Sequence, residues 1–128
     1  MATTDIPGGG VRVVIVEDNE ATANSLRQLL DLYGYEVRVA YTGLDGVQVA
    51  EEWPPDFVLC DIGLPGLDGY GVATALRHHP ATAGAHLIAI SAYSSDEARR
   101  RSREVGFERH LTKPADPDTI LDLLAARR

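Results

Sequence analysis

The stretch DFVLCDIGLPGLDGYG, residues 56–71, joins an apolar run to an aspartate and a glycine-rich loop. Residues 57–60 are continuously apolar, which is typical of a strand that is covered on both faces of a sheet. Asp61 follows this run directly, and Gly63 and Gly66 lie in the loop behind it. A carboxylate in this place can be a metal ligand, a nucleophile or a turn-former. The rest of the sequence has to decide between these roles.

Further apolar runs along the chain predict a sheet. They are rich in Val, Ile and Tyr, as strands are, and they cover residues 11–16, 35–41, 86–91 and, more weakly, 109–112. The run 35–41 alternates, with Glu36 and Arg38 on one side, so we expect it to be an edge strand.

Helical signals fill the gaps between these runs. Cap-type residues stand at the expected helix starts Asn19, Thr42, Ser94 and Asp116. Thr42 and Ser94 are each followed three residues later by an acidic residue, which is the spacing of a capping box. The order is therefore strand and helix five times over. This alternation predicts an α/β fold, a doubly wound five-stranded parallel sheet with five helices on its two faces.

Length and composition indicate one soluble domain. The chain has 128 residues, a net charge of -7 and one cysteine. A negative surface argues against nucleic-acid binding by this domain, and one cysteine cannot form an internal disulfide. No apolar run is long enough to span a membrane, and the start lacks the features of a signal peptide. We expect a cytoplasmic protein with a flexible lead-in or linker over residues 1–10 and one domain over residues 11–128.

Polar side chains close four of the predicted strands. They are Glu17 and Asp18 after the first strand, Asp61 after the third, Ser91 at the end of the fourth and Lys113 after the fifth. Sites in open parallel sheets form where the carboxyl ends of the strands meet. We therefore expect these five side chains to converge on one edge of the sheet.

The chemistry of this cluster favours phosphoryl transfer. Three carboxylates held close together repel one another unless a cation is present, and oxygen ligands suit Mg²⁺, with Mn²⁺ as the alternative ion. Asp61 could then attack phosphorus, because carboxylates are known nucleophiles that form aspartyl phosphates. The Lys113 ammonium, the Ser91 hydroxyl and backbone amides after Asp61 would neutralise the phosphoryl oxygens.

Four motifs in this order and spacing resemble a known family. VIVEDNE at 14–20, DIGLPGLDGYGV at 61–72, AISAYS at 89–94 and HLTKPAD at 110–116 are similar to the motifs of bacterial response-regulator receiver domains. The resemblance covers residues 11–127. It implies a flavodoxin-like fold with strand order 2-1-3-4-5.

The resemblance also implies roles for individual residues. Asp61 matches the phosphoacceptor, Asp18 a direct magnesium ligand, Glu17 a water-mediated ligand and Gly63 a ligand through its carbonyl. None of these roles follows from spacing alone.

The remaining matched positions concern the switch. Ser91 matches the hydroxyl residue that responds to the phosphoryl group, and Lys113 matches the lysine that pairs with it, before a cis bond to Pro114. His110 stands where the family usually has Tyr or Phe. It could swing inward as that aromatic does and add pH sensitivity, or it could be a surface residue without a switch role.

The family implies a phosphorelay partner, either a histidine kinase or a phosphotransfer protein. Phosphorylation would switch a protein-interaction surface. The face formed by the predicted helix 94–106, strand 109–112 and helix 115–128 could serve as an output or homodimer surface, with no membrane contact. The chain could be a stand-alone regulator or the C-terminal receiver of a hybrid histidine kinase.

Other functions remain as alternatives to this signalling role. A magnesium-dependent aspartyl-phosphate phosphatase uses a similar site, but its nucleophile closes the first strand of the sheet rather than the third. A pseudo-receiver that binds without being phosphorylated is another alternative. A hydrolase triad of Ser91, His110 and Asp61 lacks the expected G-x-S-x-G turn around the serine.

Overall fold

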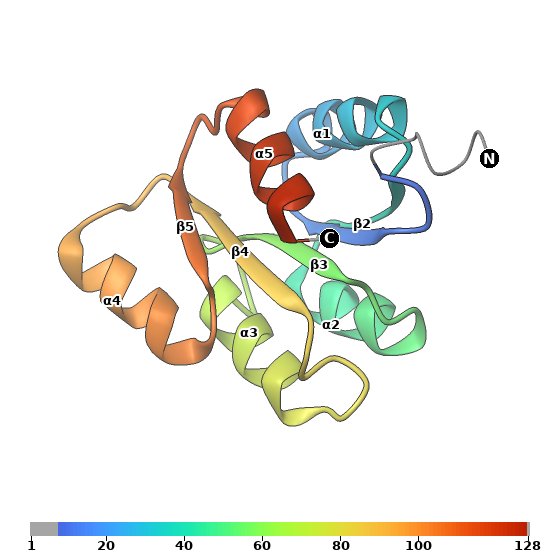
Figure 1. Cartoon of the computed structure of the whole chain (residues 1–128). Coiled ribbons are helices and arrows are strands. Elements are labelled where there is room, and N and C mark those ends of the chain that lie inside the picture. Colours follow the sequence, from blue (N-terminus) through green and yellow to red (C-terminus); the bar gives the residue numbers. More distant parts are fainter. Residues whose placement is uncertain (1–7, 128) are drawn as a thin grey trace.

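The computed structural model describes residues 8–127, which form five parallel strands and five helices in alternation (Figure 1). The strands pair in the order β2-β1-β3-β4-β5, as predicted. Their bounds are β1 Arg12–Val16, β2 Glu36–Ala40, β3 Phe57–Asp61, β4 His86–Ser91 and β5 Arg109–Thr112. The helices are α1 Glu20–Leu32, α2 Gly43–Glu52, α3 Gly69–His78, α4 Asp96–Val105 and α5 Pro117–Arg127. The predicted edge strand, β2, lies at one end of the sheet.

The helices cover the sheet in two layers (Figure 1). On one face, Leu30 of α1 and Leu124 of α5 pack with Ile15 and Leu59. On the other face, residues of α2 and α3 pack with the strand residues that point the opposite way, such as Val58. β1 and β3 have buried residues on both faces because each lies between two other strands and under both helix layers.

Helix starts were mostly predicted from the cap residues. The side chains of Asn19 and Thr42 accept hydrogen bonds from the amides of Thr22 and Asp45, as expected. The prediction of Ser94 as the cap of α4 was wrong by one residue. Ser95 caps this helix and accepts from the amide of Ala98 at 3.1 Å. Either of two adjacent serines has the side chain that a helix cap needs. Ser95 takes this role, and the backbone carbonyl of Ser94 accepts a hydrogen bond from the Arg99 side chain.

The predicted lead-in covers residues 1–10, of which residues 1–7 lie outside the described part. Residues 8–10 form a turn in which the Gly8 amide donates to the Tyr33 carbonyl at 2.7 Å. A Cβ atom at Gly8 would lie 2.5 Å from the Tyr35 ring, so this turn packs closely against Tyr35. No helix within residues 8–127 is long and apolar enough to cross a membrane.

Arg77 joins the C-terminal end of α4 to α3. Its guanidinium donates to the carbonyls of Ala83 and Ala85, both at 2.7 Å, and to the carbonyl of Gly106 at 2.6 Å. Gly106 ends α4 with a φ of 111°, and a Cβ atom there would lie 2.5 Å from Arg77 Nε. Glycine is therefore favoured at this position both by its backbone conformation and by the approach of the arginine.

Candidate functional site

Three carboxylates meet at the carboxyl edge of the sheet. Asp61 is the last residue of β3, and Glu17 and Asp18 follow the neighbouring strand β1. One carboxylate oxygen from each of the three lies within 4.8 Å of the other two. Glu17 is 6% exposed and Asp61 8% exposed. The structure thus brings together the three acidic residues that the sequence predicted.

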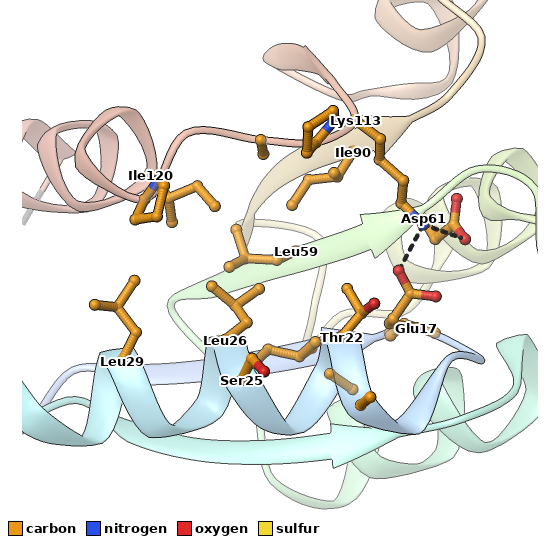
Figure 2. A pocket seen from close by; sticks show the side chains of 17 residues that line it. Glu17, Thr22, Ser25, Leu26, Leu29, Leu59, Asp61, Ile90, Lys113 and Ile120 are labelled. Carbon is orange, nitrogen blue, oxygen red and sulfur yellow. Dashed lines mark hydrogen bonds and ion pairs between the residues drawn. The ribbon is translucent and has the colours of Figure 1, made fainter.

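Lys113, in the segment after β5, reaches two of these carboxylates (Figure 2). Its Nζ lies 2.6 Å from Glu17 Oε1 and 3.0 Å from Asp61 Oδ2. Its backbone amide donates to the Ser91 carbonyl at 2.9 Å, which fixes the start of the segment after β5. The peptide bond between Lys113 and Pro114 is cis.

The loop after β3 presents a backbone amide to Asp61. The Gly63 amide donates to Asp61 Oδ1 at 3.0 Å, so the two carboxylate oxygens have different partners. The loop returns to the strand through Gly69, whose amide donates to the Ile62 carbonyl at 2.9 Å. A Cβ atom at Gly69 would lie 2.6 Å from the Asp61 carbonyl oxygen, so the first residue of α3 packs directly on the backbone of the site.

Ser91 ends β4 beside this cluster, one residue beyond the pairing of Asp61 with Ile90. Its side chain is fully buried, and its Oγ accepts a hydrogen bond from the Tyr93 amide at 2.9 Å. The hydroxyl hydrogen of Ser91 can still be donated to another acceptor.

The His110 ring contacts α4 and the loop after β4. Its Nδ1 is 2.7 Å from Ser102 Oγ, and its Nε2 is 2.8 Å from the Tyr93 carbonyl oxygen. The hydrolase triad of Ser91, His110 and Asp61 is therefore not formed, because both ring nitrogens have other partners. The contact with Ser102 is one that the sequence analysis missed.

The charge balance of the site suits a divalent cation. Burial raises the pKa of Glu17, with Asp18 and Asp61 adding to the effect, and the hydrogen bond from Lys113 offsets it only in part. Burial alone would lower the pKa of Lys113, but its hydrogen bonds to Glu17 and Asp61 outweigh this, so the pKa is raised. Three carboxylates against one ammonium leave an excess of negative charge, and hard oxygen donors fit Mg²⁺.

Glu17→Gln is expected to stabilise the chain near neutral pH in the absence of divalent ions. Because the pKa of Glu17 is raised on folding, the protonated form stabilises the fold at low pH, and that stabilisation is lost as the pH rises through the folded pKa. The glutamine variant has no such loss. Denaturant unfolding in EDTA should show a gain over wild type at neutral pH that disappears below the ordinary carboxyl range. An equal gain at all pH values would contradict this reasoning.

A cavity of about 670 Å³ opens beside Asp61 and Lys113. It lies between α1 and the segment that joins β5 to α5, over the sheet (Figure 2). Its wall is mostly apolar and includes Leu26, Leu29 and Ile120. The sequence analysis did not foresee this cavity; small residues on α1, such as Ala21 and Ala23, were the available signal.

Comparison with known proteins gives one consistent result. Residues 13–125 match the family described as the response regulator receiver domain. The protein PilH of Pseudomonas aeruginosa is 31% identical over 115 residues, which are 90% of this chain and 95% of PilH. The polar-differentiation response regulator DivK of Brucella abortus is 34% identical over 112 residues, which are 88% of this chain and 91% of DivK.

Solved structures agree with this result. A CheY-like response regulator receiver domain protein from Methanospirillum hungatei is 30% identical and superposes with a TM-score of 0.83, covering 91% of both chains. A putative response regulator from Chloroflexus aurantiacus is 32% identical with a TM-score of 0.82, covering 91% of this chain and 98% of the other.

Proposed function

The chain belongs to the response regulator receiver domain family, and from this premise we propose that Asp61 is its phosphoacceptor. A receiver domain is the phosphoacceptor module of two-component signalling. The observation that carries the assignment to Asp61 is its pair of contacts: the Gly63 amide on one carboxylate oxygen and the Lys113 ammonium on the other. Asp61 also ends β3, the central strand of the sheet.

The proposed reaction is a transfer of one phosphoryl group to the Asp61 carboxylate. A carboxylate oxygen forms a bond to phosphorus, and the bond from phosphorus to the donor breaks with its electron pair leaving on the donor. The Lys113 ammonium and the Gly63 amide contact the Asp61 carboxylate, and Ser91 ends the neighbouring strand β4; these three groups would pair with the phosphoryl oxygens. Their arrangement before the reaction reduces the cost of ordering them during it.

A magnesium ion, with Mn²⁺ as the alternative, is proposed as the cofactor. Asp18 and Asp61 would hold it directly, Glu17 through water and Gly63 through its carbonyl; these carboxylates are the clustered acidic groups of the described residues. The ion would neutralise the phosphoryl oxygens. The pKa of Glu17 is raised mainly by burial and further by Asp18 and Asp61, and the charge of the ion would act against this rise.

Receiver domains interact with histidine kinases or phosphotransfer proteins, and we propose a partner of this class as the donor. The domain is then a signalling switch rather than an enzyme, located in the cytoplasm, without nucleic-acid or membrane contact of its own. The net charge of -7 argues against nucleic-acid contact.

The output or homodimer surface is proposed on α4, β5 and α5. Three of the four arginines on α4 have partners within the chain. The positive charge that this surface can offer to another protein is therefore smaller than the sequence suggests. Arg99 donates to the His110 carbonyl at 3.0 Å, Arg100 pairs with Glu104 at 3.6 Å, and Arg101 lies 4.2 Å from the Tyr70 ring centroid.

Chemical trapping tests the proposed acceptor. The protein is incubated with acetyl phosphate and Mg²⁺, and the product is reduced with borohydride, which converts an aspartyl phosphate to homoserine. Peptide mass spectrometry should find one phosphoryl group before reduction and homoserine only at position 61. Homoserine at position 18 instead, or an unmodified folded protein, would show that Asp61 is not the acceptor.

Mg²⁺ is expected to stabilise the folded chain against unfolding. At a concentration about 100 times its dissociation constant, a ligand that binds only the folded state adds about 2.7 kcal/mol to the unfolding free energy. Asp18→Asn removes a proposed ligand and should lose most of this gain. Asp122→Asn, on the exposed side of α5, changes the net charge equally and should keep it. Thermal unfolding across a magnesium titration measures both, and equal responses would exclude Asp18 as a ligand.

A further inference from the structure

Three hydrogen bonds in series connect α4 to Ser91. Ser102 Oγ lies 2.7 Å from His110 Nδ1, and His110 Nε2 lies 2.8 Å from the Tyr93 carbonyl oxygen. The Tyr93 amide in turn donates to Ser91 Oγ at 2.9 Å. The series crosses from a helix to β5 and then to the loop after β4, so it joins three elements that are separate in sequence.

For a neutral His110 ring, the partners determine which atom donates in each bond. A carbonyl oxygen can only accept, so His110 Nε2 must carry a hydrogen. A neutral imidazole has one ring hydrogen, so Nδ1 accepts and the Ser102 hydroxyl donates to it. The Tyr93 amide donates to Ser91. All three bonds therefore run in the same direction, from Ser102 to Ser91, and they satisfy both ring nitrogens without a charge on the ring.

Ser102 is an unusual residue for its helix. It is 0% exposed, and it is the buried residue of α4, whose other positions include the four arginines. A serine within a helix commonly bonds to solvent or to a carbonyl of the preceding turn. Here its hydroxyl is directed at the His110 ring. Loss of this donor would remove the hydrogen bond that Nδ1 of the half-buried His110 makes within the chain.

We propose that Ser102 is a positioning residue that, through His110 and Tyr93, holds the Ser91 hydroxyl in place and carries the state of Asp61 to α4. This rests on the proposed phosphorylation of Asp61. His110 acts in it as the neutral tautomer with its hydrogen on Nε2.

The common direction of the three hydrogen bonds affects how well the Ser91 hydroxyl can donate. Ser91 Oγ accepts from Tyr93, which polarises its own O–H and makes it a better donor. A phosphoryl group on Asp61 brings negative charge and strong acceptor oxygens to the sheet edge beside β4. When the Ser91 hydroxyl donates to such an oxygen, the Tyr93 amide bonded to Ser91 moves with it, and the carbonyl of the same residue passes this movement to the His110 ring. Arg99, which donates to the His110 carbonyl at 3.0 Å, is the charged side chain that contacts this histidine.

The unphosphorylated protein tests the series on its own. Two-bond ¹H–¹⁵N spectra of the histidine rings, recorded at a pH where His110 is neutral, should show its hydrogen on Nε2. In Ser102→Ala the Nδ1 resonance should move towards that of a nitrogen without a hydrogen bond, and Ser102→Thr should restore it. His110→Phe removes both ring bonds and identifies the signal. A hydrogen on Nδ1 in wild type, or an unchanged Nδ1 resonance in Ser102→Ala, overturns the proposal.

The phosphorylated protein tests the link to Asp61. After acetyl phosphate and Mg²⁺, with occupancy measured by mass spectrometry, the His110 ring resonances and the α4 amides should shift in wild type. In Ser102→Ala at equal occupancy, the His110 shift should persist and the α4 shift should fall by more than half. Shifts in α4 that do not depend on Ser102 overturn the proposal while leaving Asp61 as acceptor. If Asp61 takes no phosphoryl group, the link falls with the proposed function, and the ring spectra still decide the series itself.

Discussion

Asp61→Asn is expected to abolish covalent phosphorylation by acetyl phosphate. Asparagine has almost the same shape as aspartate, but its neutral amide lacks the anionic oxygen that attacks phosphorus. Loss of the nucleophile in a covalent mechanism lowers the rate on the order of 10⁶-fold, so no product should be detected by mass spectrometry. The fold should persist, because the Gly63 amide can still donate to the side-chain oxygen at position 61.

Asp68→Asn is the matched control for this variant. Asp68 lies in the same loop and caps α3, with Oδ1 accepting from the Gly71 amide at 2.9 Å. Asparagine caps helices about as well as aspartate, and the charge changes by the same amount as in Asp61→Asn. Phosphorylation should therefore stay near wild type. Phosphate uptake that survives in Asp61→Asn, or that is lost in both variants, would contradict the assignment of the acceptor.

Leu87→Ala is expected to cost about 2–5 kcal/mol of unfolding free energy, because it removes a fully buried side chain and leaves a cavity. Leu87 lies on β4, is 0% exposed and packs in the same cluster as Val58 and Leu76. Leu44→Ala removes the same atoms from a side chain that is 71% exposed, so its effect should stay within about 0.5 kcal/mol. Denaturant unfolding of both variants measures the difference. Equal effects would mean that the core is packed differently.

The fold was predictable because apolar strand runs and helical patterns alternate along the chain. The apolar run before Asp61 and the alternating run before Tyr41 differ in pattern, and the structure places them on a central and an edge strand, respectively. Even the short β5, whose residues are half-buried or exposed, was predicted from a weak apolar run. The error at Ser94 and Ser95 is of a different kind, since both serines satisfy the local rule and packing selects one of them.

The site was predictable to the extent that strand ends determine it. Glu17, Asp61 and Lys113 meet because parallel strands bring their carboxyl ends to one edge. The contact between Ser102 and His110 was not predictable, because it depends on how α4 rotates and tilts against β5. The cavity beside α1 has the same origin, since it depends on the spacing between two helices that no local pattern encodes.

The bonds of Arg77 to three carbonyls hold the C-terminal end of α4 against α3 and the loop after it. They anchor the end of the helix at Gly106, whereas the Ser95 end is attached to the loop that contains Tyr93. Arg99 holds the first half of the same helix to β5, through the His110 carbonyl and Thr112 Oγ1. One guanidinium therefore fastens α4 near each end, and a displacement of the helix requires one of these two groups to exchange its acceptors.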